Sequence, residues 1–216
     1  MKDVFLDTDP GIDDAMALIY LASCPSVNIR AISTVMGNAS LDDCTANALF
    51  LKEKFRLTAP IYRGASLCIN GKEPHSFPDQ VHGKNGLGDV VPINTELCCE
   101  SRSAHSAMAN LALQSPNKIT LLAIGQLTNV ALAMLAQVNF SKDLNEIILM
   151  GGSLNFPGNV TAWAEANIYG DPEAAEIVLR SEVPLTMVGL DVTMKTRISQ
   201  NFLKDLTSRL GDLGRF

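Results

Sequence analysis

Four aspartates within residues 7–14 are the side chains of this sequence best suited to chemistry. The stretch reads DTDPGIDD and directly follows an apolar run, Val4–Leu6. Clustered negative charges repel one another unless a positive group neutralises them. A hard divalent cation bound by oxygen ligands does this most simply, so the cluster predicts a metal site. The alternative is that Asp13 and Asp14 only stabilise a helix N-terminus, which would explain one or two of the four acids.

The elements on either side of the cluster determine where it must lie. Its apolar run is typical of a buried strand, Pro10-Gly11 of a tight turn, and the apolar stretch Ala15–Ala22 of a buried helix. In open α/β sheets the ligands bind at the carboxyl ends of the strands. The acids are therefore expected at a binding edge of the sheet.

Strands and helices alternate along the rest of the chain. The further strands that we predict are 27–35, 60–62, 118–124, 146–150 and 185–190, and the helices are 41–55, 103–114, a segment ending near 136, a segment from 172, and 199–210. The stretches 63–92 and 153–170 read as long loops, which are usually functional. We expect an α/β fold: an open, mostly parallel sheet with helices on both faces and a Rossmann-like core, forming one domain over residues 1–216.

Composition excludes several classes of protein. The net charge is −6 without a basic cluster, which argues against a nucleic-acid surface. No apolar run approaches a membrane span and no signal segment opens the chain, so we expect a cytoplasmic protein. The five cysteines lack C-x-x-C spacing, which disfavours structural zinc and a disulfide framework.

The predicted loops at the binding edge carry mainly amides. They include Asn38, residues 124–126, residues 155–167 and Asp191. Amides and carboxylates can donate to or accept from hydroxyl groups, so this set suits a polyhydroxylated ligand held on a metal. Trp163, the single tryptophan, could stack on a ring of the ligand or pack over the pocket.

The ordered motifs carry a family resemblance. DTDPGIDDA at residues 7–15 resembles the opening signature of the nucleoside hydrolase family of the inosine-uridine preferring type. The similarity continues in the family's order through TVMGN at 34–38, HG at 82–83 with Gly88, GQLTN at 125–129, ILMGG at 148–152, NVT at 159–161, AEANI at 164–168 and DPEAA at 171–175.

This resemblance implies a calcium-dependent enzyme of nucleoside salvage. It would hydrolyse the N-glycosidic bond of a purine and/or pyrimidine ribonucleoside to free base and ribose. Asp9 matches the catalytic base and a calcium ligand, Asp14 a second calcium ligand, and Ile124 a ligand through its backbone carbonyl. The substrate contacts that it implies are Asp13, Asn38, Asn159, Glu165 and Asn167. His82 and Trp163 are candidates for the side of the nucleobase.

The resemblance also implies a missing part and leaves alternatives. Family chains continue past residue 216 with a His-Asp pair, so we expect a C-terminally incomplete chain. It could be a crippled remnant that binds calcium or ribose, or only folds. A phosphohydrolase of the haloacid dehalogenase type would instead use Asp7 as nucleophile and Asp9 as acid/base. The family further implies that the chain forms a homodimer or homotetramer. Its small-molecule partner would be a ribonucleoside.

Overall fold

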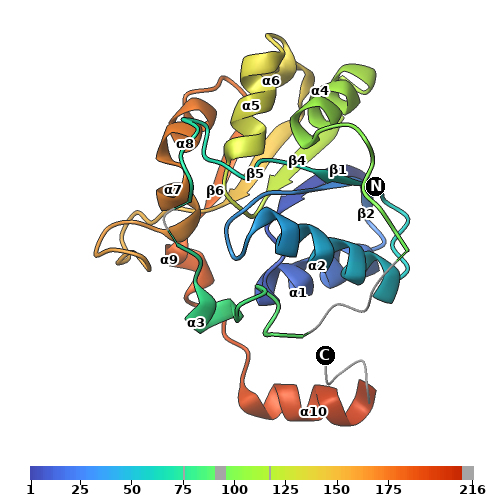
Figure 1. The fold of residues 1–216 in the computed structure, drawn as a ribbon, viewed down its shortest axis with the longest axis vertical. Coiled ribbons are helices and arrows are strands. Elements are labelled where there is room, and N and C mark those ends of the chain that lie inside the picture. Colours follow the sequence, from blue (N-terminus) through green and yellow to red (C-terminus); the bar gives the residue numbers. More distant parts are fainter. Residues whose placement is uncertain (75, 91–95, 117, 211–216) are drawn as a thin grey trace.

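A single parallel sheet organises the molecule (Figure 1). The computed structural model describes residues 1–74, 76–90, 96–116 and 118–210. The strands are β1 (Lys2–Thr8), β2 (Val27–Thr34), β3 (Ile61–Arg63), β4 (Ile119–Ala123), β5 (Glu146–Met150) and β6 (Leu185–Val188). Their order is β3-β2-β1-β4-β5-β6, and every neighbouring pair is parallel. The predicted open α/β sheet is confirmed.

Helices cover both faces of this sheet (Figure 1). They are α1 (Ile12–Ser23), α2 (Leu41–Lys54), α3 (Asp79–His82), α4 (Ala104–Gln114), α5 (Thr128–Ala136), α6 (Phe140–Asp143), α7 (Ala166–Gly170), α8 (Pro172–Leu179), α9 (Leu190–Thr193) and α10 (Gln200–Leu210). One face packs against α4, α5, α6 and α8, and the other against α1 and α2.

Local sequence signals account for two of the helix starts. The Ser40 hydroxyl accepts a hydrogen bond from the backbone N–H of Asp43 and so begins α2. The Asp171 carboxylate accepts from the N–H of Ala174, and Pro172 takes the first position of α8. Ser, Asp and Pro are residue types that favour these positions at a helix start.

Short elements were missed by the sequence patterns. The four-residue helices α6 and α9 were not predicted, and α3 and α7 interrupt segments that were predicted as loops. The strand predicted over 185–190 ends at Val188, because Leu190 already begins α9. Residues 75, 91 and 92 of the predicted loop 63–92 lie outside the described residues.

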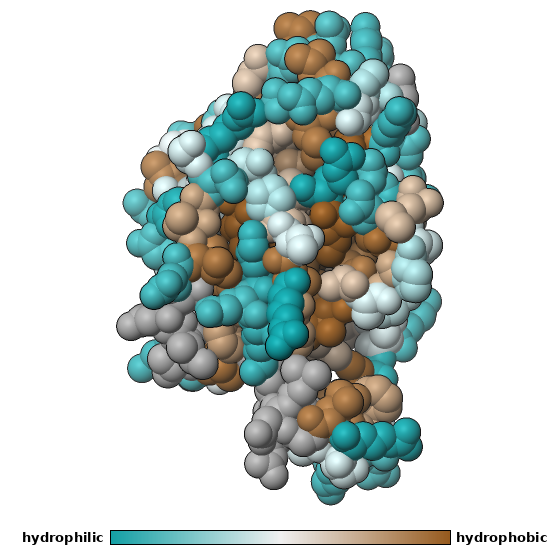
Figure 2. All heavy atoms as spheres, turned by 90° about the vertical axis from the view of Figure 1, so that its right-hand side faces the viewer, coloured by the Kyte–Doolittle hydropathy of each residue, from teal (hydrophilic) through white to brown (hydrophobic). Residues whose placement is uncertain are grey.

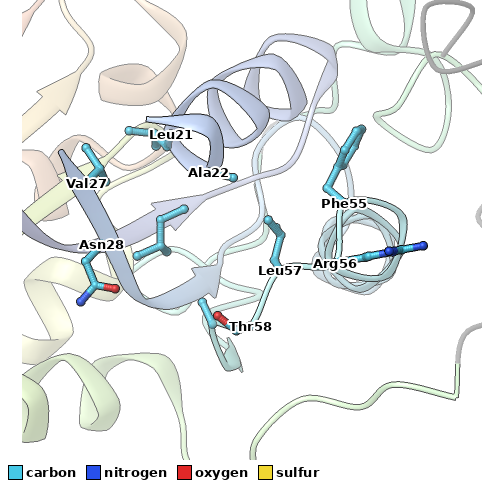
Figure 3. A pocket seen from close by; sticks show the side chains of 10 residues that line it. Leu21, Ala22, Val27, Asn28, Phe55, Arg56, Leu57 and Thr58 are labelled. Carbon is cyan, nitrogen blue, oxygen red and sulfur yellow. The ribbon is translucent and has the colours of Figure 1, made fainter. Parts of the chain in front are cut away.

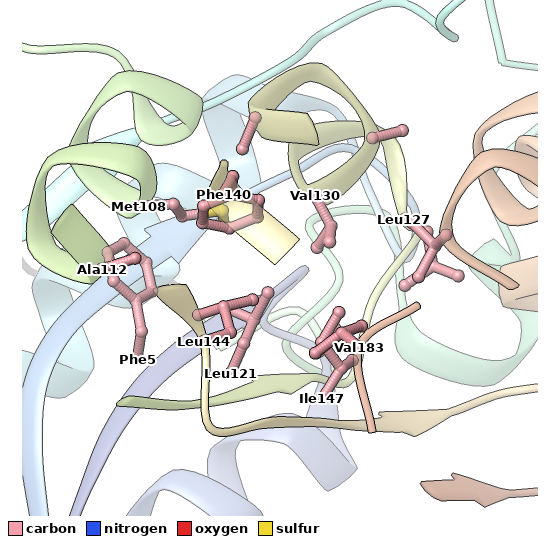
Figure 4. Close-up of a cluster of buried hydrophobic side chains, with 14 of the residues drawn as sticks. Phe5, Met108, Ala112, Leu121, Leu127, Val130, Phe140, Leu144, Ile147 and Val183 are labelled. Carbon is pink, nitrogen blue, oxygen red and sulfur yellow. The ribbon is translucent and has the colours of Figure 1, made fainter. Parts of the chain in front are cut away.

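Two apolar clusters hold the layers together. The larger one lies between the sheet and α4–α6 and α8 (Figure 4), and Phe140 is fully buried in it.

The amphipathic α10 has no buried residue, and its Phe202 and Leu203 are about half exposed. In Figure 2 hydrophobic residues are visible on the surface of α10, which lies at the bottom of the molecule. No helix in the described ranges has the length and apolar character needed to cross a membrane.

Replacing Phe140 tests the larger cluster. Phe140→Ala should lower the free energy of unfolding by about 3–5 kcal/mol, because it removes a buried ring and leaves a cavity. Chemical denaturation measures this. Val138→Ala is the matched control, since Val138 is 91% exposed and its replacement should change stability by less than about 0.5 kcal/mol. Equal losses in both variants would contradict this packing.

Candidate active site

The acidic stretch lies where the order of the strands reverses. Asp9 follows β1 and Ile124 follows β4, and these two parallel strands are neighbours at the centre of the sheet. The N–H of Ile124 donates to the carbonyl of Asp7 at 2.9 Å, which brings the two strand ends together. Chains that leave such neighbouring strands toward opposite faces open a crevice between them, where ligands bind.

A cavity of about 530 Å³ opens at this edge. Asp9 and Asn38 contribute to its wall, and part of the segment 74–82, including α3, borders it. The lining residues are Asp9, Gly37, Asn38, Pro74, Ser76, Phe77, Pro78, Gln80, Val81, His82, Gln126, Asn159, Val160, Ala166, Asn167, Tyr169 and Gly170. An acid, several amides and an apolar border suit a small polar ligand.

Asp9 is 2% exposed, and its two carboxylate oxygens have different surroundings. Oδ2 accepts a hydrogen bond from the N–H of Asn38 at 2.8 Å, whereas the buried Oδ1 has no hydrogen-bond partner. The backbone approaches the carboxylate closely on both sides, because a side chain at Gly37 or Gly125 would overlap it. Asp9 is thus fixed through one oxygen and has acceptor capacity at the other.

Asp14 is the second buried acid of the site. Its Oδ1 accepts from the Thr8 hydroxyl at 2.5 Å, and its Oδ2 accepts from the N–H of Gly11 at 3.1 Å. The Asn38 amide also donates to Oδ2 at 2.9 Å and to the carbonyl of Asp9 at 3.1 Å. Asn38 therefore bridges the two acids, which makes their separation a fixed property of the fold.

Burial raises the pKa of both acids. Loss of solvation, followed by repulsion from Asp14, raises the pKa of Asp9 well above its ordinary value. Loss of solvation, followed by repulsion from Asp13, raises the pKa of Asp14 to about 7. Two carboxylates that resist ionisation side by side form a site whose charge a cation would stabilise.

The donor set fits a hard divalent cation. Asp9 and Asp14 supply carboxylate oxygens, one of them unpaired, and Ile124 offers a backbone carbonyl that accepts from the Asn167 amide at 2.9 Å. Calcium prefers such oxygen ligands. No group of three or more His, Cys, Asp or Glu within the described part of the chain is arranged to hold a metal. The donors that the structure brings to this edge are two carboxylates and a backbone carbonyl.

Four of the other predicted residues line the cavity: Asn38, His82, Asn159 and Asn167. The Asn167 amide donates to the carbonyls of Ile124 and Met150 and so ties the ends of β4 and β5. Asn159 is exposed and accepts from the N–H of Ala166. The backbone N–H of Ile12 donates to His82 Nδ1, with 3.4 Å between the two nitrogens.

Five predicted residues are not among those lining the cavity: the two other candidate cation ligands, Asp14 and Ile124, and three residues predicted to contact the substrate, Asp13, Glu165 and Trp163. Glu165 is buried, and its carboxylate accepts from the N–H groups of Gly152, Asn167 and Ile168 as the cap of α7. The side chain of Asp13 is 81% exposed, with its Oδ1 3.8 Å from His82 Nδ1, and Trp163 is 89% exposed. Their roles toward a substrate stay predictions from the resemblance.

Gln126 and Tyr169 line the cavity but were not predicted as site residues. Gln126 is 6% exposed, and its buried Oε1 has no hydrogen-bond partner. Gly170 leaves room for it, since a side chain there would overlap the Gln126 amide. The signal in the sequence was its position two residues after Ile124, in a loop already expected at the binding edge.

Asp7 does not suit the phosphohydrolase alternative. It is fully buried within β1 and is absent from the cavity wall. Its Oδ1 accepts from the Ser33 hydroxyl at 2.5 Å and from the Asn129 amide at 2.9 Å. A nucleophile must reach its substrate. This position is therefore structural, and the haloacid dehalogenase reading is wrong.

A smaller cavity of about 250 Å³ lies elsewhere, between the end of α1, the start of β2 and the segment after α2 (Figure 3). Leu21, Phe55 and Leu57 are among the apolar side chains that line it, and Arg56 is its one charged residue. Without an acid or base to pair with that cation, it offers none of the chemistry of the first cavity.

Comparison with solved structures places this fold among nucleoside hydrolases. A plant nucleoside hydrolase, PpNRh1, matches with a TM-score of 0.93 and 36% identity, over 95% of this chain and 65% of that one. A purine-preferring ribonucleoside hydrolase from Gardnerella vaginalis matches with a TM-score of 0.93 and 31% identity, over 99% and 69%.

The sequence comparisons agree. The family model described as inosine-uridine preferring nucleoside hydrolase matches residues 4–216, and the chain belongs to this family. Uridine nucleosidase 1 of Arabidopsis thaliana is 40% identical over 206 residues, 95% of this chain and 61% of that protein. The pyrimidine-specific ribonucleoside hydrolase RihB of Escherichia coli is 38% identical over 197 residues, 90% and 61%. The chain thus spans about three fifths of these two proteins.

The raised pKa of Asp14 predicts how stability depends on pH. A carboxyl whose pKa is raised by folding contributes its full stabilisation below the unfolded pKa, and this stabilisation is lost as the pH rises through the folded pKa of about 7. In the presence of a chelator, the free energy of unfolding should therefore fall by roughly 2 kcal/mol between pH 5.5 and pH 8 through this group alone. Chemical denaturation at the two pH values measures it.

Asp14→Asn is the matched control, because an asparagine does not titrate. This variant should lose most of the pH dependence that Asp14 causes. Saturating calcium should remove the loss at pH 8 in the wild type, since a cation stabilises the ionised acids. Identical pH profiles for wild type and variant in chelator would contradict the assignment.

Proposed function

We propose that this chain carries the catalytic base and most of the sugar site of a calcium-dependent ribonucleoside hydrolase. The reaction is hydrolysis of the N-glycosidic bond to free base and ribose. One observation carries the proposal: Asp9 lies buried at the cavity wall with one oxygen fixed by Asn38 and the other unpaired. A buried, oriented carboxylate with free acceptor capacity is what a general base requires.

Asp9 would take a proton from the water that attacks the anomeric carbon. Its Oδ2 is held by the N–H of Asn38, so that Oδ1 is the oxygen available to accept the proton. Calcium, when bound by Asp9, Asp14 and the carbonyl of Ile124, would hold sugar hydroxyls and make a water more acidic. Asp14 is oriented for this by Thr8, Gly11 and Asn38.

The remaining polar groups suit the sugar and the departing base. Bond cleavage builds positive charge on the sugar ring, which carboxylates and amide oxygens stabilise. Asn159 and Asn167 lie in the cavity wall for hydroxyl contacts, and His82 lies in the same wall with its Nδ1 accepting from the backbone. We assign His82 to the side of the base.

The family and the names of its relatives support a choice of substrate. The names of the relatives from Arabidopsis thaliana and Escherichia coli refer to uridine and to pyrimidine ribonucleosides, whereas the Gardnerella vaginalis structure is of a purine-preferring enzyme. We therefore place uridine first and inosine second. A role in salvage, a cytoplasmic location and a homo-oligomeric state remain predictions of the sequence.

Ribose release from uridine and inosine tests the proposal. The 216-residue chain should release ribose in calcium and stop in chelator. Asp9→Asn should lower the rate by about 10²–10⁴-fold, because the amide cannot accept the proton of the water. Asp205→Asn is the control, since this aspartate on α10 pairs with Arg209 away from the cavity and should leave the rate unchanged.

Two results would oppose the proposal. Release that continues undiminished in Asp9→Asn would remove this residue as the base. No release from folded wild-type chain would favour the remnant alternative, in which the portion binds calcium or ribose without turnover.

A further inference from the structure

Asn129 is a fully buried amide at the start of α5 that the proposed chemistry leaves without a role. Its Nδ2 donates to Asp7 Oδ1 at 2.9 Å and to the carbonyl of Thr34 at 3.0 Å. Its Oδ1 accepts from the N–H of Ala65 at 2.9 Å. One amide therefore bonds three separate segments at the edge of the sheet that bears the site.

Those three segments are neighbours at the binding edge. Asp7 and Thr34 lie at the ends of β1 and β2, and Ala65 follows β3. Gly64 permits the approach, because a side chain there would overlap both the Asn129 amide and the carbonyl of Thr34. A buried amide with both its donors and its acceptor satisfied is held in one orientation.

The hydrogen bonds of Asn129 connect to the acid pair through the backbone of the turn after β2. Ala65, which it binds, accepts through its carbonyl from the N–H of Met36 at 3.2 Å. Thr34 directly precedes the turn 35–38, and Met36 lies within it. The N–H of Val35, the first residue of this turn, donates to the carbonyl of Thr8 at 3.1 Å. The last residue of this turn is Asn38, which donates to both acids.

We propose that Asn129 is a positioning residue: its amide fixes the turn 35–38 so that Asn38 sets the orientation of Asp9 and Asp14. The inference rests on the proposed function, in that it takes this acid pair as the reaction centre. Asn129 is absent from the cavity wall and acts through the backbone of the turn.

The adjacent residue provides a matched control. Thr128 is also fully buried, and its hydroxyl donates to Asp171 Oδ2 at 2.6 Å. That carboxylate also accepts from the N–H of Ile69 at 2.7 Å. Thr128 thus secures the segment near Ile69 and has no bond to the turn 35–38, so Thr128→Val perturbs the same helix start without the proposed effect.

Amide hydrogen exchange, followed by NMR on the full chain in chelator, tests the proposal. Asn129→Ala should make the amides of Met36 and Asn38 exchange at least about tenfold faster, because the turn opens locally. Thr128→Val should leave these two amides unchanged and speed exchange at Ile69. Calcium titration should show affinity falling roughly tenfold in Asn129→Ala and not in Thr128→Val, as for other groups that orient metal ligands.

Unchanged exchange at Asn38 in Asn129→Ala would overturn the proposal, and so would an equal rise throughout the chain, which marks global destabilisation. If Asn129→Ala does not fold, Asn129→Asp replaces it, because it keeps the acceptor for Ala65 and loses both donors. Asp7→Asn retains an acceptor oxygen for Asn129 and should behave as wild type. Since exchange is measured without calcium or nucleoside, it decides this proposal even if the chain releases no ribose.

Discussion

The burial of two carboxylates side by side is the constraint on which the rest of the structure depends. Ionised carboxylates removed from water lose several kcal/mol of solvation unless hydrogen bonds or a cation compensate them. Here the compensation is partial: Thr8, Gly11 and Asn38 donate to the pair, while Asp9 Oδ1 stays unpaired. This remaining electrostatic need supports the proposal that the pair binds a cation and that Asp9 accepts a proton.

The fold meets this constraint through backbone geometry. The neighbouring ends of β1 and β4 set Asp9 beside Gly125, and the turn after β2 brings Gly37 against the same carboxylate. Neither glycine could carry a side chain there without overlapping Asp9. The site is therefore enclosed by backbone on two sides, which limits water and fixes the direction of the unpaired oxygen.

Much of this was predictable from the sequence because its signals are local. The apolar runs predicted the central strands, and the acid cluster predicted the binding edge. What failed depends on tertiary contacts: α6 and α9 are single turns too short for periodicity to detect. Spacing also gave no sign that the buried Glu165 caps α7, because that role depends on where the chain turns after β5. Its predicted contact with a substrate stays a prediction.

Calcium titration by calorimetry tests the central claim most directly, because it depends on the acid pair and not on turnover. The wild-type chain should bind one calcium ion at pH 8, and Asp14→Ala should abolish most of that binding while far-ultraviolet circular dichroism stays unchanged. An unaltered titration in folded Asp14→Ala, or no binding by the wild type, would contradict the view that these buried carboxylates form a cation site.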